Sequence, residues 1–328
     1  RPCKGIDTGD NGYFLRLWHE VALNKIDDSR GEGDWVPYNK GGDFRRWFGN
    51  RDYVLRWNGS DEELSSRLKL TKKKPTLRNK DRWFKESFTW TSVTASTYSA
   101  RYSPAGAMFD NGGSSIFSPN HLFVIGGLIN SVVARRYFDV LSPSINYQPG
   151  EIGNLPYSGV LAETGSLIYE GIKDLVGSNI KISKYDWDSH ETSWDFKANE
   201  LIALKNEVFL SINGEKQSIP TLLTEILEDY KSKWSRLFYQ LHSNEEELNR
   251  QFIEIYGLQD ELTPDVPLEE ITILQQGEIS IENNEIVWHD DVIIKQLISY
   301  AVGCWMGRYR LDKPGLHIAH PNPSSEEV

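Results

Sequence analysis

The sequence predicts an α+β fold, in which a mixed α/β domain is followed by a mainly helical domain. Between residues 35 and 117, short aromatic or β-branched runs are separated by Gly, Asn and Pro, which is typical of strands and turns. Beyond residue 158, apolar residues recur mostly at helical spacing. The charge changes at the same place, because residues 1–150 hold 22 Lys and Arg against 16 Asp and Glu, whereas residues 151–328 hold 14 against 31. We therefore expect one domain at residues 1–150 and an acidic helical domain at residues 158–328.

The elements of the first domain follow from local patterns. We expect a helix from Tyr13 to about Leu23, and strands at residues 53–57 and 87–93, where apolar and polar residues alternate. Residues 121–141 predict a helix that is apolar around most of its surface and is therefore buried. Proline and glycine then indicate an irregular boundary near residues 143–158.

In the second domain, amphipathic patterns predict helices at residues 160–175, 201–209 and 220–241. Asn244, followed by Glu247, has the spacing of an N-cap, and Gly257 lies where a C-terminal cap belongs, so we expect a separate helix between them. Residues 279–288 predict a hairpin around Asn283-Asn284, and residues 292–306 predict a further buried helix.

Composition excludes several classes of protein. With 328 residues, 39% of them apolar and 12% aromatic, the chain is long and apolar enough to fold as about two domains. Its two cysteines, Cys3 and Cys304, form no disulfide framework, which favours a reducing cytoplasm. We find no signal peptide, and the longest apolar run, residues 122–134, is too short to span a bilayer. Since the first residue is Arg1 and the last residues, 324–328, resemble the start of a helix, we expect a piece of a longer protein.

Catalytic motifs are missing from the sequence. An enzyme that methylates an amino group needs an Asn/Asp-Pro-Pro-Tyr/Phe loop to hold the flipped base, but the only Asn-Pro, at Asn322-Pro323, continues with two serines. There is no dinucleotide-binding loop, P-loop or nucleophile elbow. His317 and His320, with Cys304, make a poor zinc site. We therefore predict no catalytic and no metal-binding residue, and no cofactor bound by this chain.

The net charge of −11 argues against nucleic acid, but a global charge can hide a basic face. The sequence WVPYNKGGDFRRWFGNR at residues 35–51 combines a glycine pair with basic and aromatic side chains, and a second basic run follows at residues 69–85. Such residues can hold phosphate oxygens, although a solvated loop or an internal stack of Arg45 and Arg46 on Trp47 and Phe48 is the competing interpretation. The predicted DNA contacts are Lys40, Arg45, Arg46, Arg51, Lys72, Lys73, Lys74, Arg78, Lys80, Arg82 and Arg101.

Several motifs, in order along the chain, resemble the BREX-type (PglX-like) adenine-specific DNA methyltransferases. They are GIDTGDN at residues 5–11, WVPYNKGG at 35–42, RYSP at 101–104, NYQPGEI at 146–152, GLQDELTP at 257–264 and SYAVGC at 299–304. In this family, the matching region is the target-recognition domain and the helical region after it. The resemblance implies that residues 1–150 are the target-recognition domain, which reads a site in duplex DNA.

The resemblance also implies a parent enzyme of phage defence that transfers a methyl group from S-adenosylmethionine to adenine N6. The expected partners are duplex DNA, the missing N-terminal methyltransferase domain and other phage-defence subunits. For the acidic second half, a solvated helical scaffold competes with a surface that clamps against the catalytic domain or a partner subunit. Two alternatives remain for the whole chain: the recognition region of a fused type II restriction–modification enzyme, and a protein-binding scaffold with no direct DNA contact.

Overall fold

The computed structural model describes residues 1–27, 33–67, 76–142, 145–206 and 222–317. It contains helices and three small sheets of four, four and two strands, so the predicted α+β class is confirmed. The chain divides into two compact units. Unit 1 consists of Arg1–Lys184 and Asn244–Val266, and unit 2 consists of Tyr185–Ser243 and Pro267–Val328. Neither unit follows the predicted ranges 1–150 and 158–328, and separate folding of those two ranges stays a prediction.

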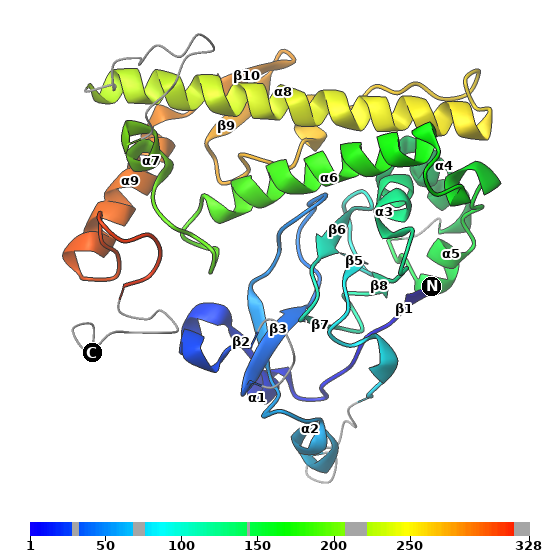
Figure 1. Cartoon of the computed structure of the whole chain (residues 1–328), viewed down its shortest axis with the longest axis horizontal. Coiled ribbons are helices and arrows are strands. Elements are labelled where there is room, and N and C mark those ends of the chain that lie inside the picture. The colour runs from blue at the N-terminus through cyan, green and yellow to red at the C-terminus, as the bar shows by residue number, and fades with distance from the viewer. Residues whose placement is uncertain (28–32, 68–75, 143–144, 207–221, 318–328) are drawn as a thin grey trace. The chain divides into compact units, whose positions relative to one another are not determined.

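Unit 1 contains both four-stranded sheets (Figure 1). One sheet has the order β1-β8-β5-β6, with all neighbours antiparallel; its strands are β1 (Pro2–Cys3), β8 (Ser115–Ile116), β5 (Ser87–Trp90) and β6 (Ala100–Ser103). The other has the order β2-β4-β3-β7, with β3 and β7 parallel; its strands are β2 (Leu15–Leu17), β4 (Tyr53–Arg56), β3 (Trp35–Asn39) and β7 (Met108–Phe109). The predicted strands at 53–57 and 87–93 are confirmed as β4 and β5.

The predicted helix from Tyr13 to Leu23 is wrong. A single turn, α1 (Asn11–Phe14), is followed at once by β2, in which Leu15 pairs with Leu55 of β4. Phe14 and Leu15 are both buried although they are neighbours, because a turn ends between them and β2 enters the sheet. Sheet pairing therefore outweighs the helical spacing of this segment.

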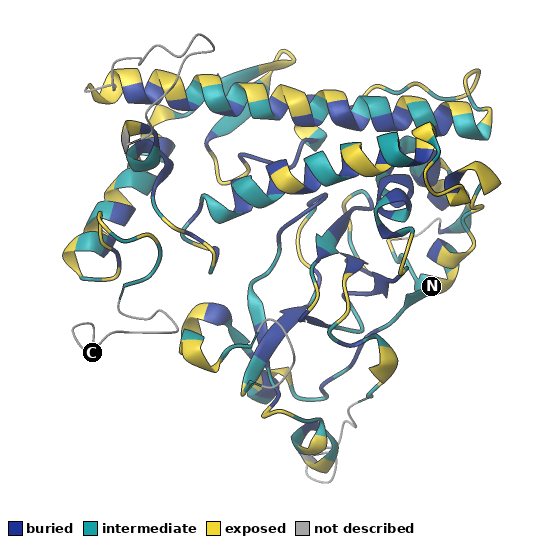
Figure 2. Ribbon diagram, viewed as in Figure 1, coloured by how far each residue is buried: buried dark blue, intermediate teal, exposed yellow. Residues whose placement is uncertain are grey.

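The predicted helix at residues 121–141 is two helices, α3 (Leu122–Asn130) and α4 (Val132–Leu141), separated by extended backbone at Ser131. The Ser131 hydroxyl accepts a hydrogen bond from the Ala134 amide, so it caps α4. The buried environment predicted for this segment is confirmed for α3 (Figure 2). Glycine permits its close packing, because a Cβ on Gly126 would lie 2.2 Å from Phe88 Cζ in β5.

In the described part of the chain, four further α-helices have all or part of their length in unit 1. They are α2 (Glu62–Arg67), α5 (Pro149–Gly153), most of α6 (Leu167–Asp188) and the last part of α8 (Leu223–Tyr256). The expected helix at 160–175 thus begins later, after a short 3-10 turn at Gly159–Ala162. Among the described residues, no helix is both long and apolar enough to cross a bilayer.

Unit 2 contains the rest of α6 and α8, with α7 (Glu200–Asn206), the hairpin β9 (Ile279–Glu282) and β10 (Glu285–Trp288), and α9 (Asp290–Trp305). The predicted hairpin is confirmed, with Ile281 opposite Ile286. The separate helix expected to begin at Asn244 is wrong, since α8 runs without a break to Tyr256, but Gly257 follows it with φ 65° as predicted.

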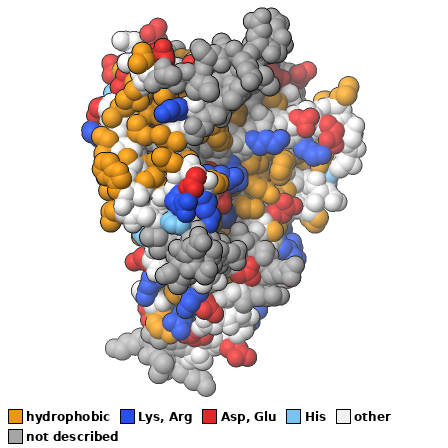
Figure 3. Space-filling model, turned by 60° about the vertical axis from the view of Figure 1, so that its left-hand side comes forward, with side chains coloured by type: hydrophobic (Ala, Val, Ile, Leu, Met, Phe, Trp, Pro, Cys, Tyr) orange, Lys and Arg blue, Asp and Glu red, His pale blue; other side chains and the backbone are white. Residues whose placement is uncertain are grey.

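The last helix, α9, has the predicted range but not the predicted burial. Only Ile293, Tyr300 and Gly303 of this helix are buried. Hydrophobic side chains gather at the surface on the side where α9 lies (Figure 3). Trp305, the last residue of α9, is 84% exposed, and Met306, which follows it, is 70% exposed. The apolar spacing of residues 292–306 therefore marks two faces, of which only one is packed.

Candidate nucleic-acid interface

The first basic segment starts where β3 ends. Lys40 follows this strand directly, and its Nζ lies 4.5 Å from the centre of the Tyr53 ring. Gly41 and Gly42 come next, with φ 101° and 141°, which side chains rarely adopt. A Cβ on Gly42 would lie 2.6 Å from Asn50 Nδ2. The glycine pair thus brings the backbone close to other loops of its own unit, while Lys40 stays half-buried.

Arg46 lies inside unit 1 and forms a buried ion pair with Glu245 of α8, in which both side chains are about 95% covered. The other carboxylate oxygen of Glu245 accepts a hydrogen bond from the Trp47 indole at 2.7 Å. Glu245 therefore satisfies two consecutive residues that are about 200 positions away in sequence. Arg46 thus lies inside the fold, as the alternative to a DNA contact predicted. Its partner Glu245 was not indicated by the sequence patterns.

Arg45 and Arg101 are also buried. The Arg45 Nε donates to the Phe48 carbonyl at 2.9 Å, and Arg101 is 1% exposed within β6. Burial lowers the pKa of Arg101 to about 10, so its guanidinium keeps its charge at neutral pH. Two of its nitrogens, Nε and Nη1, have no hydrogen-bond partner among the described residues. In this conformation neither Arg45 nor Arg101 is accessible to a polyanion.

Arg51 is half-buried, with its guanidinium 5.7 Å from the centre of the Phe48 ring. Lys184 approaches the same ring at 5.0 Å. These cation–π contacts position Arg51 beside the aromatic core without covering it fully. Of the predicted contacts at residues 40–51, Lys40 and Arg51 are therefore the ones that retain access to solvent.

The second basic segment is more open. Arg78 and Lys80 are exposed, and Arg82 is half-buried. Lys80 pairs with Asp61, and the Arg82 Nε lies 3.1 Å from the Asp81 carboxylate. Arg78 makes no ion pair among the described residues. The predicted contacts Lys72, Lys73 and Lys74 lie outside the described residues.

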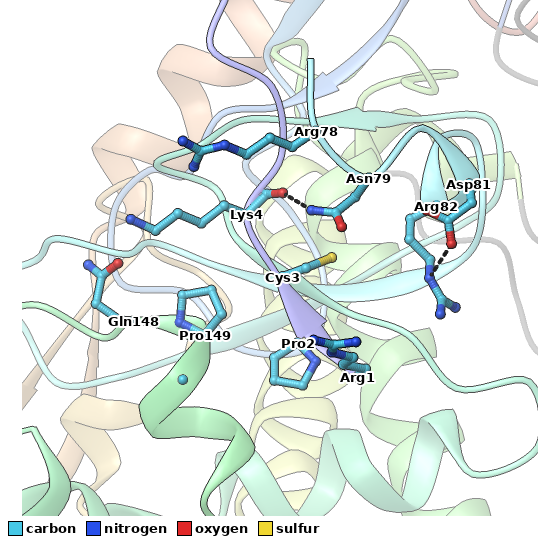
Figure 4. A pocket seen from close by; sticks show the side chains of 11 residues that line it. Arg1, Pro2, Cys3, Lys4, Arg78, Asn79, Asp81, Arg82, Gln148 and Pro149 are labelled. Atoms are coloured by element: carbon cyan, nitrogen blue, oxygen red, sulfur yellow. Dashed lines mark hydrogen bonds and ion pairs between the residues drawn. The ribbon is translucent and has the colours of Figure 1, made fainter. Parts of the chain in front are cut away.

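The structure brings this segment next to two cations that the sequence patterns did not single out. Arg1 and Lys4 flank β1, and the Lys4 carbonyl accepts a hydrogen bond from the Asn79 side chain at 2.7 Å. Together with Arg78 and Arg82 they line one pocket of about 580 Å³ (Figure 4). The two cations in the first four residues were the available signal, but only the folded structure shows that they meet residues 78–82, through the Asn79–Lys4 hydrogen bond and the shared pocket.

Among the described residues, no group of three or more His, Cys, Asp and Glu side chains could hold a metal ion.

In unit 2, buried His190 Nε2 lies 2.6 Å from Glu278, and His190 Nδ1 lies 2.7 Å from the Asp186 carbonyl. Burial alone would lower the pKa of His190, but the Glu278 hydrogen bond and the nearby acidic charges outweigh it, and the pKa is raised.

Comparisons with known proteins give two similar sequences. An adenine-specific methyltransferase PglX of Lacticaseibacillus casei (strain Zhang) is 34% identical over 96% of this chain, and an adenine-specific methyltransferase BrxX of Escherichia coli O9:H4 (strain HS) is 34% identical over 98%. The chain spans about a quarter of the length of each. No family model matches it. The resemblance to BREX-type adenine-specific methyltransferases predicted from the motifs is thereby confirmed.

Proposed function

From the likeness of this chain to a quarter-length segment of adenine-specific methyltransferases, we propose that it is the duplex-DNA recognition module of such an enzyme. The observation that carries the proposal is the extent of the match, which covers almost the whole chain rather than one motif. An enzyme that methylates adenine in DNA must hold the duplex and present one base, and phosphate contacts from Lys and Arg provide the hold. The excess of six positive charges in residues 1–150 supports this assignment.

Within this proposal, the phosphate contacts come from the accessible cations of unit 1. These are Lys40, Arg51, Arg78, Lys80 and Arg82, joined by Arg1 and Lys4. We keep Lys72, Lys73 and Lys74 as proposed phosphate contacts because of the basic sequence pattern alone. Arg45, Arg46 and Arg101 are buried within unit 1, so no phosphate contact is assigned to them.

The methyl donor belongs elsewhere in the longer protein. S-adenosylmethionine carries a sulfonium and an ammonium against a single carboxylate, and the positive charges of Arg1, Lys4 and Arg78 around the described pocket would repel this net positive charge. The residues of this pocket therefore do not fit the donor, and no step of methyl transfer is assigned to this chain. We propose that the part of the enzyme outside this quarter supplies the donor site and the catalytic loop.

The proposal is tested by the salt dependence of duplex binding. Fluorescence anisotropy of a labelled duplex, titrated with the 328-residue chain at several KCl concentrations, measures the dissociation constant at each. Each phosphate contact contributes a slope of about −0.9 to the plot of log affinity against log salt. We expect tight binding at low salt and a slope corresponding to several contacts. A chain that does not bind at low salt, or binds with no salt dependence, contradicts the proposal and favours a protein-binding scaffold.

A further inference from the structure

The pocket between β1 and residues 78–82 has an unusual charge for an acidic protein. Its lining includes four cationic side chains, Arg1, Lys4, Arg78 and Arg82, and one carboxylate, Asp81. Asp81 is paired with Arg82. Within the described part of the chain, Arg1, Lys4 and Arg78 make no ion pair, so the lining keeps an uncompensated positive charge. Positive side chains that converge on a concave surface focus their field into it.

The side chains that carry this charge also converge in space. In Figure 4, the Lys4 ammonium and the Arg78 guanidinium extend to the same side of the pocket, together with the Gln148 amide. Arginine presents a planar set of donors that matches phosphate. The Gln148 side-chain Nε2 donates one hydrogen bond to Asn146 and has a second N–H that can donate to a ligand. The volume of about 580 Å³ exceeds the space that a bare anion needs, and leaves room for the groups attached to a phosphate.

The backbone around the pocket is held in place without a ligand. The Asn79 side chain ties residues 78–82 to the Lys4 carbonyl, and the Trp83 indole donates to the Arg78 carbonyl at 3.0 Å. The Gln148 backbone N–H donates to the Glu151 carboxylate at 2.7 Å, which fixes the start of α5. A ligand that enters the pocket therefore pays little to order its walls.

We propose that this pocket binds a phosphate group, namely a backbone phosphodiester of the duplex that the chain recognises. The inference rests on the proposed function and deepens it, because it places one fixed phosphate contact at Lys4 and Arg78. Duplex DNA is the source that the volume favours, since a phosphodiester brings its sugars with it. A free phosphate ion shares the chemistry, and the experiment distinguishes the two sources.

Gly150 provides a variant that changes the charge of the pocket without disturbing its walls. It is exposed at the pocket edge, its φ is not positive, and a Cβ there would meet no atom within 4 Å. Gly150→Glu therefore adds a negative charge beside the cations, and Gly150→Gln is the neutral control of nearly the same size. Arg78→Gln removes one proposed contact from the other side.

The experiment measures duplex binding by anisotropy over a range of KCl concentrations for these variants. We expect Gly150→Glu and Arg78→Gln each to weaken binding by about 5-fold at 0.15 M salt and to lower the salt slope by about one, as for one lost phosphate. Gly150→Gln should bind like the unmodified chain. If the unmodified chain binds the duplex and Gly150→Glu binds as well as Gly150→Gln, the pocket inference is overturned while the proposed function stands.

A second titration, with inorganic phosphate at constant ionic strength and followed by calorimetry, separates the sources. If the unmodified chain fails to bind any duplex, the proposed function fails. Phosphate binding that Gly150→Glu abolishes would then assign the pocket to the free ion. The absence of both duplex and phosphate binding overturns the inference.

Discussion

At the scale of single residues, burial divides the predicted basic contacts into two groups. Arg46 and Arg101 look like surface cations in the sequence because they stand among polar and aromatic residues, but each lies inside unit 1. A buried arginine needs a partner, and the partner of Arg46 is Glu245, about 200 residues away. Periodicity and local composition cannot reveal such a pair, since only the packing of α8 brings the two side chains together.

The Arg46–Glu245 pair predicts a large stability effect. Because removing one partner leaves an uncompensated buried charge, Arg46→Ala should lower the free energy of unfolding by about 3–5 kcal/mol. Glu245→Ala should do the same, and the double variant should lose less than the sum of the two. Urea unfolding measures all three. Arg78→Gln, at an exposed position, is the control and should stay within about 0.5 kcal/mol of the unmodified chain. An equally small loss for Arg46→Ala would contradict the buried pair.

His190 and Glu278 predict a dependence of stability on pH. The folded pKa of His190 is raised above 6.5, so its contribution is complete below pH 6.5 and is lost as the pH rises through the folded value. Burial of Glu278 alone would raise its pKa, but the hydrogen bond and the charge of His190 outweigh burial and lower the pKa below 4.5. The contribution of Glu278 to stability is therefore present above pH 4.5 and is lost as the pH falls through the folded pKa. Unit 2 should therefore be most stable between these two values.

Thermal unfolding at a series of pH values checks this expectation. The melting temperature of the unmodified chain should fall as the pH rises from 6.5 through neutral, and His190→Gln should remove most of that fall. His19→Gln, at an exposed position of unit 1, should keep it. A melting temperature that falls equally in the two variants would show that His190 is not the group responsible.

At the scale of elements, the sequence patterns predicted correctly those elements that form by contacts between residues close in sequence. The hairpin of β9 and β10 is confirmed because Asn283 and Asn284 both adopt the left-handed conformation that a tight turn needs. The N-cap predicted at Asn244 is wrong because the Asn244 side chain bonds a neighbouring helix instead of a backbone N–H of its own helix. Its amide donates to Asn179 Oδ1 of α6 at 2.8 Å, and the helix continues through it.

The hairpin turn carries a prediction of its own. Asn284 has φ 62°, so Asn284→Gly relieves strain and should raise the free energy of unfolding by about 0.5 kcal/mol, whereas Asn284→Val should lower it by about 1–2 kcal/mol. Denaturant unfolding of both variants measures the difference. Equal stability of the glycine and valine variants would argue against this turn.

At the scale of the whole molecule, a net charge of −11 coexists with a positive excess in residues 1–150. The fold concentrates part of that excess, since Arg1 and Lys4 line the same pocket as Arg78 and Arg82, and Asn79 is hydrogen-bonded to the Lys4 carbonyl. Sequence alone predicted the basic character of the segment at 69–85 but not this convergence. The other basic segment is divided between the interior and the surface, and we therefore propose that the accessible cations of unit 1 hold the duplex.

Lysine footprinting tests this assignment most directly. The chain is acetylated with and without duplex DNA, and mass spectrometry measures the rate at each lysine. We expect the duplex to slow acetylation at Lys4, Lys40 and Lys80 and to leave Lys295 of α9 unchanged. The Lys295 side chain is 72% exposed and is paired only with Asp291 among the described residues. Unchanged rates at Lys4 and Lys40 under conditions in which the duplex is bound, or protection confined to Lys295, would contradict the account.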